Sequence, residues 1–337
     1  SMTGDDQATL TELDAGLAAS QRSGSKRIEA LSLGMKTMTL ARMGQMEEAS
    51  IVAEGALVIA EELGNERVLV RTLTNLANFH NIAGDYGRAA DLLGRQVEIN
   101  RRRGDQVGMG FGLANLAYNQ LSLGQYEAAQ EAIAQALELS VAMGAKRLSA
   151  YNRLNLGLAQ IRLQRPAGAR QEIEAANLVL VDVDDKFGVA AGHSYMGLAY
   201  ESDGQSEKAV VSYGVAAGML QEIGAAGYAI DAIAGQSRCA LLNDDSALAE
   251  QLADQVWAYL RQSGPGGLEF PLLAYESCAL VLARSGNESA YRAAVEEGYG
   301  ELLERAQKIS DSEWRDSYLR NVPEHGALIQ RWDKLSR

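Results

Sequence analysis

The sequence predicts an all-α chain that is built by stacking one helical unit many times. A pattern of small residues returns every 40 positions, and each period contains two helical segments separated by turn signals. The first turn signal of each period falls at Gly44, Gly84, Gly124, Gln164, Gly204 and Asp244. An alanine follows five residues later in every period, at Ala49, Ala89, Ala129, Ala169, Ala209 and Ala249. Self-similarity at this fixed length, with two helices per period, indicates a helical solenoid.

One period shows why each element is expected. Residues 106–123 and 125–143 are rich in Ala, Leu, Gln and Glu and carry apolar residues at spacings of three and four, as amphipathic helices do. Gly124 ends the first helix, because a helix end commonly needs a left-handed residue and glycine adopts that conformation without steric cost. A second turn signal closes each period, at Gly64, Gly104, Gly144, Asp184, Gly224 and Gly264. The alanine is interpreted as the place where the two helices approach closely.

The two ends of the chain depart from this register. Residues 7–22 fall where the second helix of an incomplete repeat would lie, and residues 266–284 and 287–309 make a further pair. Residues 312–337 supply a closing helical segment. End repeats must cover an open apolar face, so irregular ends are expected. We therefore predict an N-terminal capping helix, a solenoid and a C-terminal capping segment with the bounds 1–25, 26–309 and 310–337.

The repeats resemble the tetratricopeptide repeat along nearly the whole chain. Residues 75–77 (Asn-Leu-Ala), residues 84–86 (Gly-Asp-Tyr) and Ala89 follow the leucine, small residue, Gly-x-Tyr and alanine pattern of that family. The pattern returns 40 positions later at residues 115–117 and 124–126. The resemblance implies a right-handed superhelical solenoid of about seven helix pairs plus capping helices. It also implies that the first helix of each pair lines a concave groove and that the second forms the convex outside.

The groove positions of this family can be carried over to the chain by register. They predict a ligand-binding groove formed by Arg71, Thr74, Asn75, Asn78, Phe111, Asn115, Tyr118, Tyr151, Asn155, Tyr195 and Arg238. The same register adds Asn81, Leu158, Ser194, Leu198, Glu201, Asp231 and Tyr275.

Three of these residues, Asn75, Asn115 and Asn155, occupy the same place in successive repeats. An asparagine amide offers a donor and an acceptor, so a row of them could hold the backbone of an extended peptide without reading its side chains. Asparagines at this place have that role in kinesin light chains, which the row resembles. The alternative is that the amides bond between adjacent helices or lie in water, and the sequence leaves both possibilities open.

The segment of residues 306–325 resembles the closing segment of bacterial multidomain signalling proteins. Those chains join an ATP-hydrolysing switch module to a tetratricopeptide array and a cyclase, kinase or DNA-binding output. The resemblance implies that this array is the sensor or oligomerisation arm of a larger regulator, with a homo-oligomer as one possible state.

Composition narrows the classes of partner. The chain has 31 Lys and Arg against 44 Asp and Glu, a formal net charge of −13. Because phosphate contacts need Lys or Arg, direct binding to nucleic acid is not expected. No apolar run approaches the roughly 18 residues that span a bilayer, so we expect no membrane partner and a cytoplasmic location.

Catalytic signals are missing from the sequence. It has three histidines and two cysteines, none at a metal-ligand spacing, and it has no phosphate-binding loop and no nucleophile elbow. Cys239 and Cys278 fall near matching positions of neighbouring first helices, which favours buried thiols. We therefore expect no enzyme activity, no cofactor and no metal.

Three functional interpretations remain open. The leading one is a non-catalytic binding or sensor module that holds a peptide, a protein or a small inducer in the concave groove and belongs to a larger bacterial signalling protein. The second is a free-standing scaffold or adaptor for the assembly of protein complexes. The third and least supported is an enzyme built on a helical array, which would need a pocket with two perturbed titratable groups.

Overall fold

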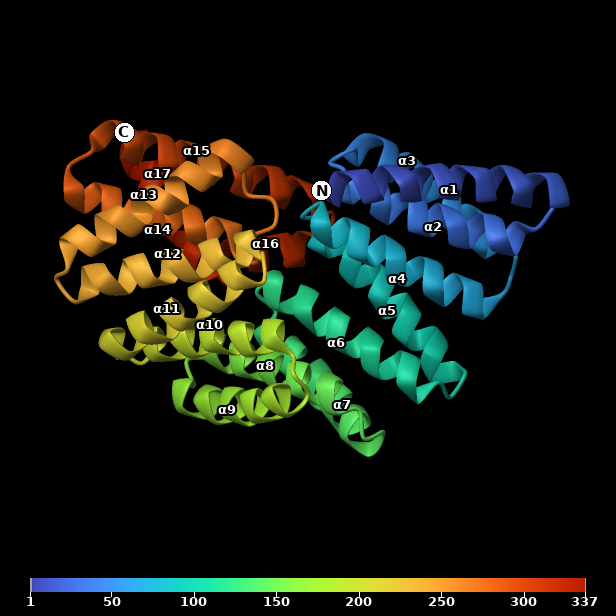
Figure 1. The fold of residues 1–337 in the computed structure, drawn as a ribbon, viewed down its shortest axis with the longest axis horizontal. Helices are drawn as coiled ribbons and strands as arrows, with labels where there is room; N and C mark the ends of the chain where they lie inside the picture. The colour runs from blue at the N-terminus through green and yellow to red at the C-terminus, as the bar shows by residue number, and fades with distance from the viewer. Residues whose placement is uncertain (1, 337) are drawn as a thin grey trace. The chain divides into compact units, whose positions relative to one another are not determined.

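The computed structural model describes residues 2–336, which form 17 helices and no strand (Figure 1). Helix α1 (Met2–Ser23) precedes seven helix pairs. The first helices of the pairs are α2 (Lys26–Arg42), α4 (Glu66–Ile82), α6 (Gln106–Ser122), α8 (Lys146–Arg162), α10 (Lys186–Ser202), α12 (Ala226–Leu242) and α14 (Pro271–Ser285). The second helices are α3 (Met46–Glu62), α5 (Tyr86–Arg102), α7 (Tyr126–Ala142), α9 (Pro166–Asp182), α11 (Ser206–Glu222), α13 (Ser246–Ser263) and α15 (Glu288–Lys308). Helices α16 (Ser312–Arg320) and α17 (Pro323–Leu335) follow. The predicted all-α repeat architecture is confirmed.

The turn positions explain why the register of 40 holds along the chain. Every glycine predicted to end a helix has a positive φ, between 63° at Gly64 and 77° at Gly44. Gln164, Asp184 and Asp244 take the same left-handed conformation at φ 58°, 52° and 60° although they have side chains. This conformation is uncommon for residues other than glycine. The repeat geometry is therefore strong enough to impose the turn where the sequence lacks its preferred residue.

The recurring alanines all lie in the core. All six are completely buried, with exposed fractions of 0%, as a close approach of the two helices in each pair requires. A larger side chain at any of them would overpack the contact.

The helices form two compact units. The first contains the chain up to Gln120 together with Lys308–Ser310, and the second contains Leu121–Gln307 together with the chain from Asp311 onward. In the first unit, the Lys308 ammonium donates a hydrogen bond to the carbonyl oxygen of Ala83, at 3.1 Å. The predicted boundaries at residues 25 and 309 stay predictions.

Among the described helices, none has the length and apolar character that a membrane crossing would need.

The core of the second unit contains a tyrosine enclosed by glycines. Tyr213 of α11 is 2% exposed, and its ring lies against Gly197 of α10 and Gly235 of α12. A Cβ atom on either glycine would come within 3 Å of ring atoms of Tyr213. Glycine at these two positions therefore allows an aromatic ring to fill the space between successive first helices.

We predict that Gly235→Ala destabilises the second unit by about 1–3 kcal/mol, because the new methyl group overpacks the Tyr213 ring. The matched control is Gly218→Ala in α11, where a Cβ atom would meet nothing within 4 Å. That variant should be more stable than the parent by about 0.5–1 kcal/mol, since alanine is the better helix former. Urea unfolding followed by circular dichroism measures both. Equal effects of the two substitutions would contradict this account of Gly235.

Candidate functional site

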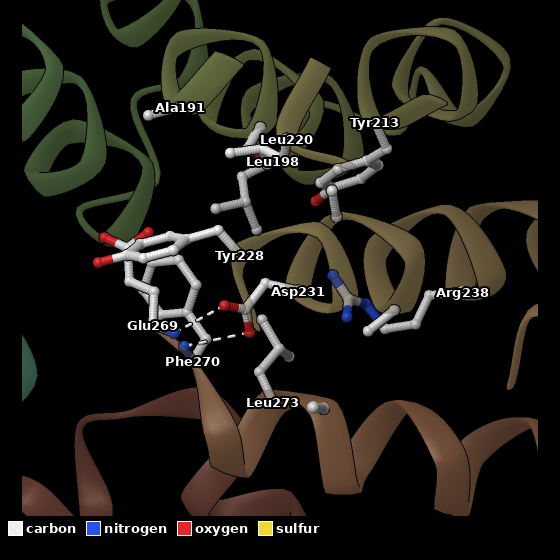
Figure 2. A pocket seen from close by; sticks show the side chains of 14 residues that line it. Ala191, Leu198, Tyr213, Leu220, Tyr228, Asp231, Arg238, Glu269, Phe270 and Leu273 are labelled. Carbon is white, nitrogen blue, oxygen red and sulfur yellow. Dashed lines mark hydrogen bonds between the residues drawn. The ribbon is translucent and has the colours of Figure 1, made fainter. Parts of the chain in front are cut away.

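Four of the groove positions predicted by register come together in the second unit. Ser194, Leu198, Asp231 and Arg238, from α10 and α12, line one pocket (Figure 2). Its free space is about 20 Å³, which holds about one water molecule. The pocket is thus a narrow extension of the groove.

The loop between α13 and α14 also lines this pocket, and Asp231 binds its backbone. The segment between α13 and α14 departs from the repeat register and brings Glu269 and Phe270 to the pocket (Figure 2). The Asp231 carboxylate accepts hydrogen bonds from the backbone N–H groups of Glu269, at 2.6 Å, and Phe270, at 3.2 Å. The Tyr195 hydroxyl donates to the Glu269 carboxylate. Tyr195, a predicted groove residue, is only 5% exposed and serves to position this loop.

The environment favours the neutral form of both carboxyl groups. Burial raises the pKa of Asp231 well above its ordinary value, and the nearby charge of Glu269 raises it further. Burial also raises the pKa of Glu269 to about 7, although the Tyr195 hydrogen bond and the charge of Arg162 act in the opposite direction. The arginines that could neutralise them are engaged elsewhere, since Arg162 and Arg238 each form an ion pair with another carboxylate.

A wider basin adjoins the narrow pocket and shares Leu198, Arg238 and Leu273 with it. Its volume is about 350 Å³. Its other lining residues are Ile161, Arg162, Gln164, Glu201, Ser202, Glu276, Pro323, Glu324 and Ala327. This basin, with the narrow pocket at its base, is the candidate functional site.

One wall of the basin is built around a buried ion pair between α12 and α10. The Arg238 guanidinium donates to both carboxylate oxygens of Glu201, at 2.7 and 2.8 Å, and to the hydroxyl of Ser277, at 2.5 Å. The Tyr213 hydroxyl donates to Glu201 at 2.6 Å. Arg238 is 6% exposed, so this predicted groove residue is held in one geometry.

The C-terminal helix α17 also lines the basin, through Pro323, Glu324 and Ala327. Glu324 accepts two hydrogen bonds from Arg162 of α8, at 2.7 and 2.8 Å, and the side chains are only 5% and 14% exposed. Burial is the largest single influence on the pKa of Glu324 and raises it, but the charges of Arg162 and His325 together with hydrogen bonds to the carboxylate outweigh burial and lower the pKa to about 2. Farther along α17, Arg331 forms a second two-fold contact with Glu276 of α14, at 2.6 and 2.7 Å. The end of the chain therefore closes one side of the groove.

The other predicted residues of the second unit lie on α8. The Tyr151 hydroxyl donates to Asp185 at 3.1 Å, and Asp185 also pairs with Arg147. Asn155 is partly buried, and its side-chain amide forms no hydrogen bond with the residues that the structure describes. Neither Tyr151 nor Asn155 lines the narrow pocket or the basin.

The remaining predicted residues belong to the first unit. Asn75 and Asn115 are partly buried on α4 and α6, and within residues 2–336 their side-chain amides form no hydrogen bond. The Asn75 amide lies against Gly34 of α2. Phe111 is 52% exposed. Of the others, Arg71 and Asn78 are exposed, whereas Thr74 and Tyr118 are partly buried.

Sequence reasoning missed the residues that lie outside the repeat pattern. Glu269 and Phe270 come from the irregular loop, where the only signal is Pro271, a residue suited to the first turn of a helix. The pairing of Arg162 with Glu324 joins residues 162 positions apart and leaves no local signal.

Cys239 and Cys278 are buried free thiols, as predicted. Among the described residues, no group of three His, Cys, Asp or Glu side chains is placed to hold a metal ion.

The helix pairs, the left-handed turns and the buried alanines define a helical repeat protein. Comparison with known families finds the tetratricopeptide repeat at residues 112–140. The chain has the fold of an array of tetratricopeptide repeats. No curated protein sequence matched it.

Solved structures share this fold over nearly the whole chain. One is a Rap protein complexed with competence and sporulation factor, with a TM-score of 0.67 and 12% identity, covering 98% of this chain and 99% of that chain. Another is NprR in complex with its cognate peptide NprX, with a TM-score of 0.63 and 14% identity, covering 99% and 98%. A third is a signal transduction ATPase with a tetratricopeptide repeat sensor from Pyrococcus horikoshii, with a TM-score of 0.51 and 14% identity, covering 91% of this chain and 43% of that one. At these identities the likeness establishes the fold.

We predict that Glu269→Gln raises stability at alkaline pH. A carboxyl whose pKa rises from 4.5 to about 7 on folding binds more protons in the folded state, so its contribution to stability falls as pH increases through that interval. The full difference between the two pKa values corresponds to roughly 3 kcal/mol of folding free energy. Glutamine keeps an acceptor for Tyr195 and carries no charge. Urea unfolding at pH 5 and pH 8 should therefore show a gain over the parent that grows with pH. Glu250→Gln, at an exposed position of α13, is the control, and a gain in it as large as in Glu269→Gln would contradict the prediction.

We also predict that Glu324→Gln costs about 3–5 kcal/mol, because it leaves the buried Arg162 without its counter-charge. The double variant Arg162→Glu with Glu324→Arg should recover part of the loss. The control is Glu297→Gln, which removes an exposed ion pair with Arg261 and should change stability by less than about 1 kcal/mol. Thermal unfolding of the four proteins measures the difference. A charge-swapped protein less stable than either single variant would show that the pair is not the source of the effect.

Proposed function

We propose that this array binds a peptide, or a peptide segment of a protein, on the face formed by its first helices, with the basin of the second unit as the principal site. The observation that carries the proposal is the basin itself. Its volume of about 350 Å³ falls within the range of about 300–1,000 Å³ that is typical of ligand pockets. Three of its lining residues, Leu198, Glu201 and Arg238, are positions that the family register predicted for the groove.

The chemistry of the basin suits a peptide. Arg162 and Arg238 supply fixed guanidinium groups, and Glu201 and Glu276 supply carboxylates, so donors and acceptors for a peptide backbone are both present. Ser202 also lines the basin, and its buried hydroxyl has no hydrogen-bond partner among the described residues. Leu198 and Leu273 add apolar surface for a side chain. Fixed polar groups around a small apolar area are the usual composition of a specific ligand site.

The fold comparisons support the same class of ligand. NprR was solved in complex with its cognate peptide, and the Rap protein with competence and sporulation factor. Both share the fold with this chain over nearly their full length. The Asn75, Asn115 and Asn155 amides remain predicted contacts to a peptide backbone, and their lack of hydrogen bonds to the described residues favours binding over a structural role.

The array is also proposed to be part of a larger protein. We infer a non-catalytic sensor arm of a larger bacterial signalling protein in the cytoplasm, because the pocket with the two perturbed carboxyl groups, Asp231 and Glu269, has a free volume of only about 20 Å³, too small for a substrate. The sequence resemblance of residues 306–325 supports this inference. The fold likeness to the sensor of a signal transduction ATPase, in which the matched array is 43% of a longer chain, supports it as well. The coding sequence on either side of these residues tests it directly.

We predict that Leu198→Trp weakens peptide binding because the larger side chain fills part of the basin. The assay is fluorescence polarisation of the purified chain with pools of labelled random hexapeptides, followed by titration of the best sequence. Binding to the Leu198→Trp variant should be at least about tenfold weaker, a loss of about 1.4 kcal/mol or more.

The matched control is Leu178→Trp, which adds the same volume at a position of α9 that is 75% exposed. It should bind like the parent. Equal binding by both variants would place the peptide elsewhere, and a parent chain that binds no hexapeptide pool would count against the proposed function itself.

A further inference from the structure

A separate pocket in the first unit is lined by three arginines. It lies between the N-terminal parts of α2 and α4 and has a volume of about 230 Å³. Its lining residues are Arg27, Leu31, Asn65, Arg67, Val68 and Arg71. No carboxylate lines it, although the chain as a whole carries a net charge of −13.

None of the three arginines is neutralised by an ion pair with another described residue. The two acidic residues nearest to them in sequence are engaged with other bases. Glu66 contacts Arg102 at 3.4 Å and Arg103 at 4.0 Å, and the Glu29 carboxylate accepts from Lys26 at 3.0 Å. The positive charge at this pocket is therefore left uncompensated by its neighbours.

The polar groups around the pocket are donors. The side-chain oxygen of Asn65 already accepts hydrogen bonds from the backbone N–H groups of Arg67, at 3.1 Å, and Val68, at 3.2 Å. That leaves the Asn65 amide N–H₂ as a donor beside the three guanidinium groups. The pocket also lies near the beginnings of α2 at Lys26 and of α4 at Glu66, where helix dipoles favour negative charge.

Three guanidinium groups at one pocket repel one another, so the arrangement is unfavourable until an anion enters. Guanidinium groups bind oxyanions through paired hydrogen bonds in a fixed geometry. Three positive charges match an anion that carries more than one negative charge. Leu31 and Val68 provide an apolar surface next to the charged groups.

We propose that this pocket is a binding site for a small ligand that carries a multiply charged oxyanion, such as a phosphoryl group or a polycarboxylate. The inference does not rest on the peptide-binding proposal, because the basin residues all belong to the second unit. Failure of one proposal therefore leaves the other unaffected.

Isothermal titration of the full chain with sodium pyrophosphate and with sodium citrate, at constant ionic strength, tests the proposal. The variants are Arg67→Gln and Arg71→Gln. Each should weaken binding of the effective anion by about tenfold, the loss expected for one charge-assisted contact. Tighter binding of pyrophosphate would assign the phosphoryl class, and tighter binding of citrate the polycarboxylate class.

The control is Arg95→Gln, an exposed arginine of α5 in the same unit that pairs with Glu61. It should bind the anion within about twofold of the parent, since its charge is already compensated. Without anion, Arg67→Gln and Arg71→Gln should unfold at the same temperature as the parent or higher, because they remove repulsion. Absence of binding to both anions would overturn the proposal, as would binding that the two variants leave unchanged.

Discussion

The structure depends on one steric constraint, the complete burial of a small alanine side chain at the same place in six of the seven helix pairs. A residue with left-handed φ precedes this alanine by five positions in each of these six pairs. The turn at Gln164, Asp184 and Asp244 is retained although glycine is absent, which shows that packing determines the backbone there. Within each unit, successive first helices consequently present equivalent positions to the same side. A groove is the result of this repetition, and no single residue specifies it.

This constraint also explains how much the sequence could predict. Periodicity of 40 positions reports local packing, so it located the helix pairs, the turns and the buried alanines. It also predicted that Ser194, Leu198, Asp231 and Arg238 share a face, and they line one pocket. It could not predict the loop that carries Glu269, because that segment leaves the register, or the wall formed by α17. Such contacts depend on where an irregular segment comes to rest after the solenoid is complete, and a short sequence window contains no signal for a partner 162 residues away.

The charged groups of the second unit are placed for geometry more than for stability. A buried ion pair gains little net free energy because desolvation offsets the attraction, yet its paired hydrogen bonds fix the positions of both side chains. Arg238 with Glu201 and Arg162 with Glu324 line the basin and are held in this way. Asp231 is not held by an arginine. Its carboxylate oxygens accept hydrogen bonds from backbone N–H groups of the loop. The basin thus has polar groups whose orientation is set before a ligand arrives, which reduces the entropy cost of binding.

The two candidate sites differ in their electrostatic character, and the difference follows from which charges are compensated. In the basin, arginines and glutamates alternate and are mostly buried, so salt screens their interactions weakly. A ligand there is selected by shape and by hydrogen-bond geometry. At the pocket of Arg27, Arg67 and Arg71, the side chains are exposed and no carboxylate lines the site. Attraction of an anion to exposed charges is long-ranged and is screened by salt over about 10 Å at 0.1 M ionic strength. The negative charge of the whole chain opposes the approach of anions in general, so the local excess of arginine must outweigh it at short range. Affinity at that pocket should therefore depend on ionic strength far more steeply than affinity in the basin.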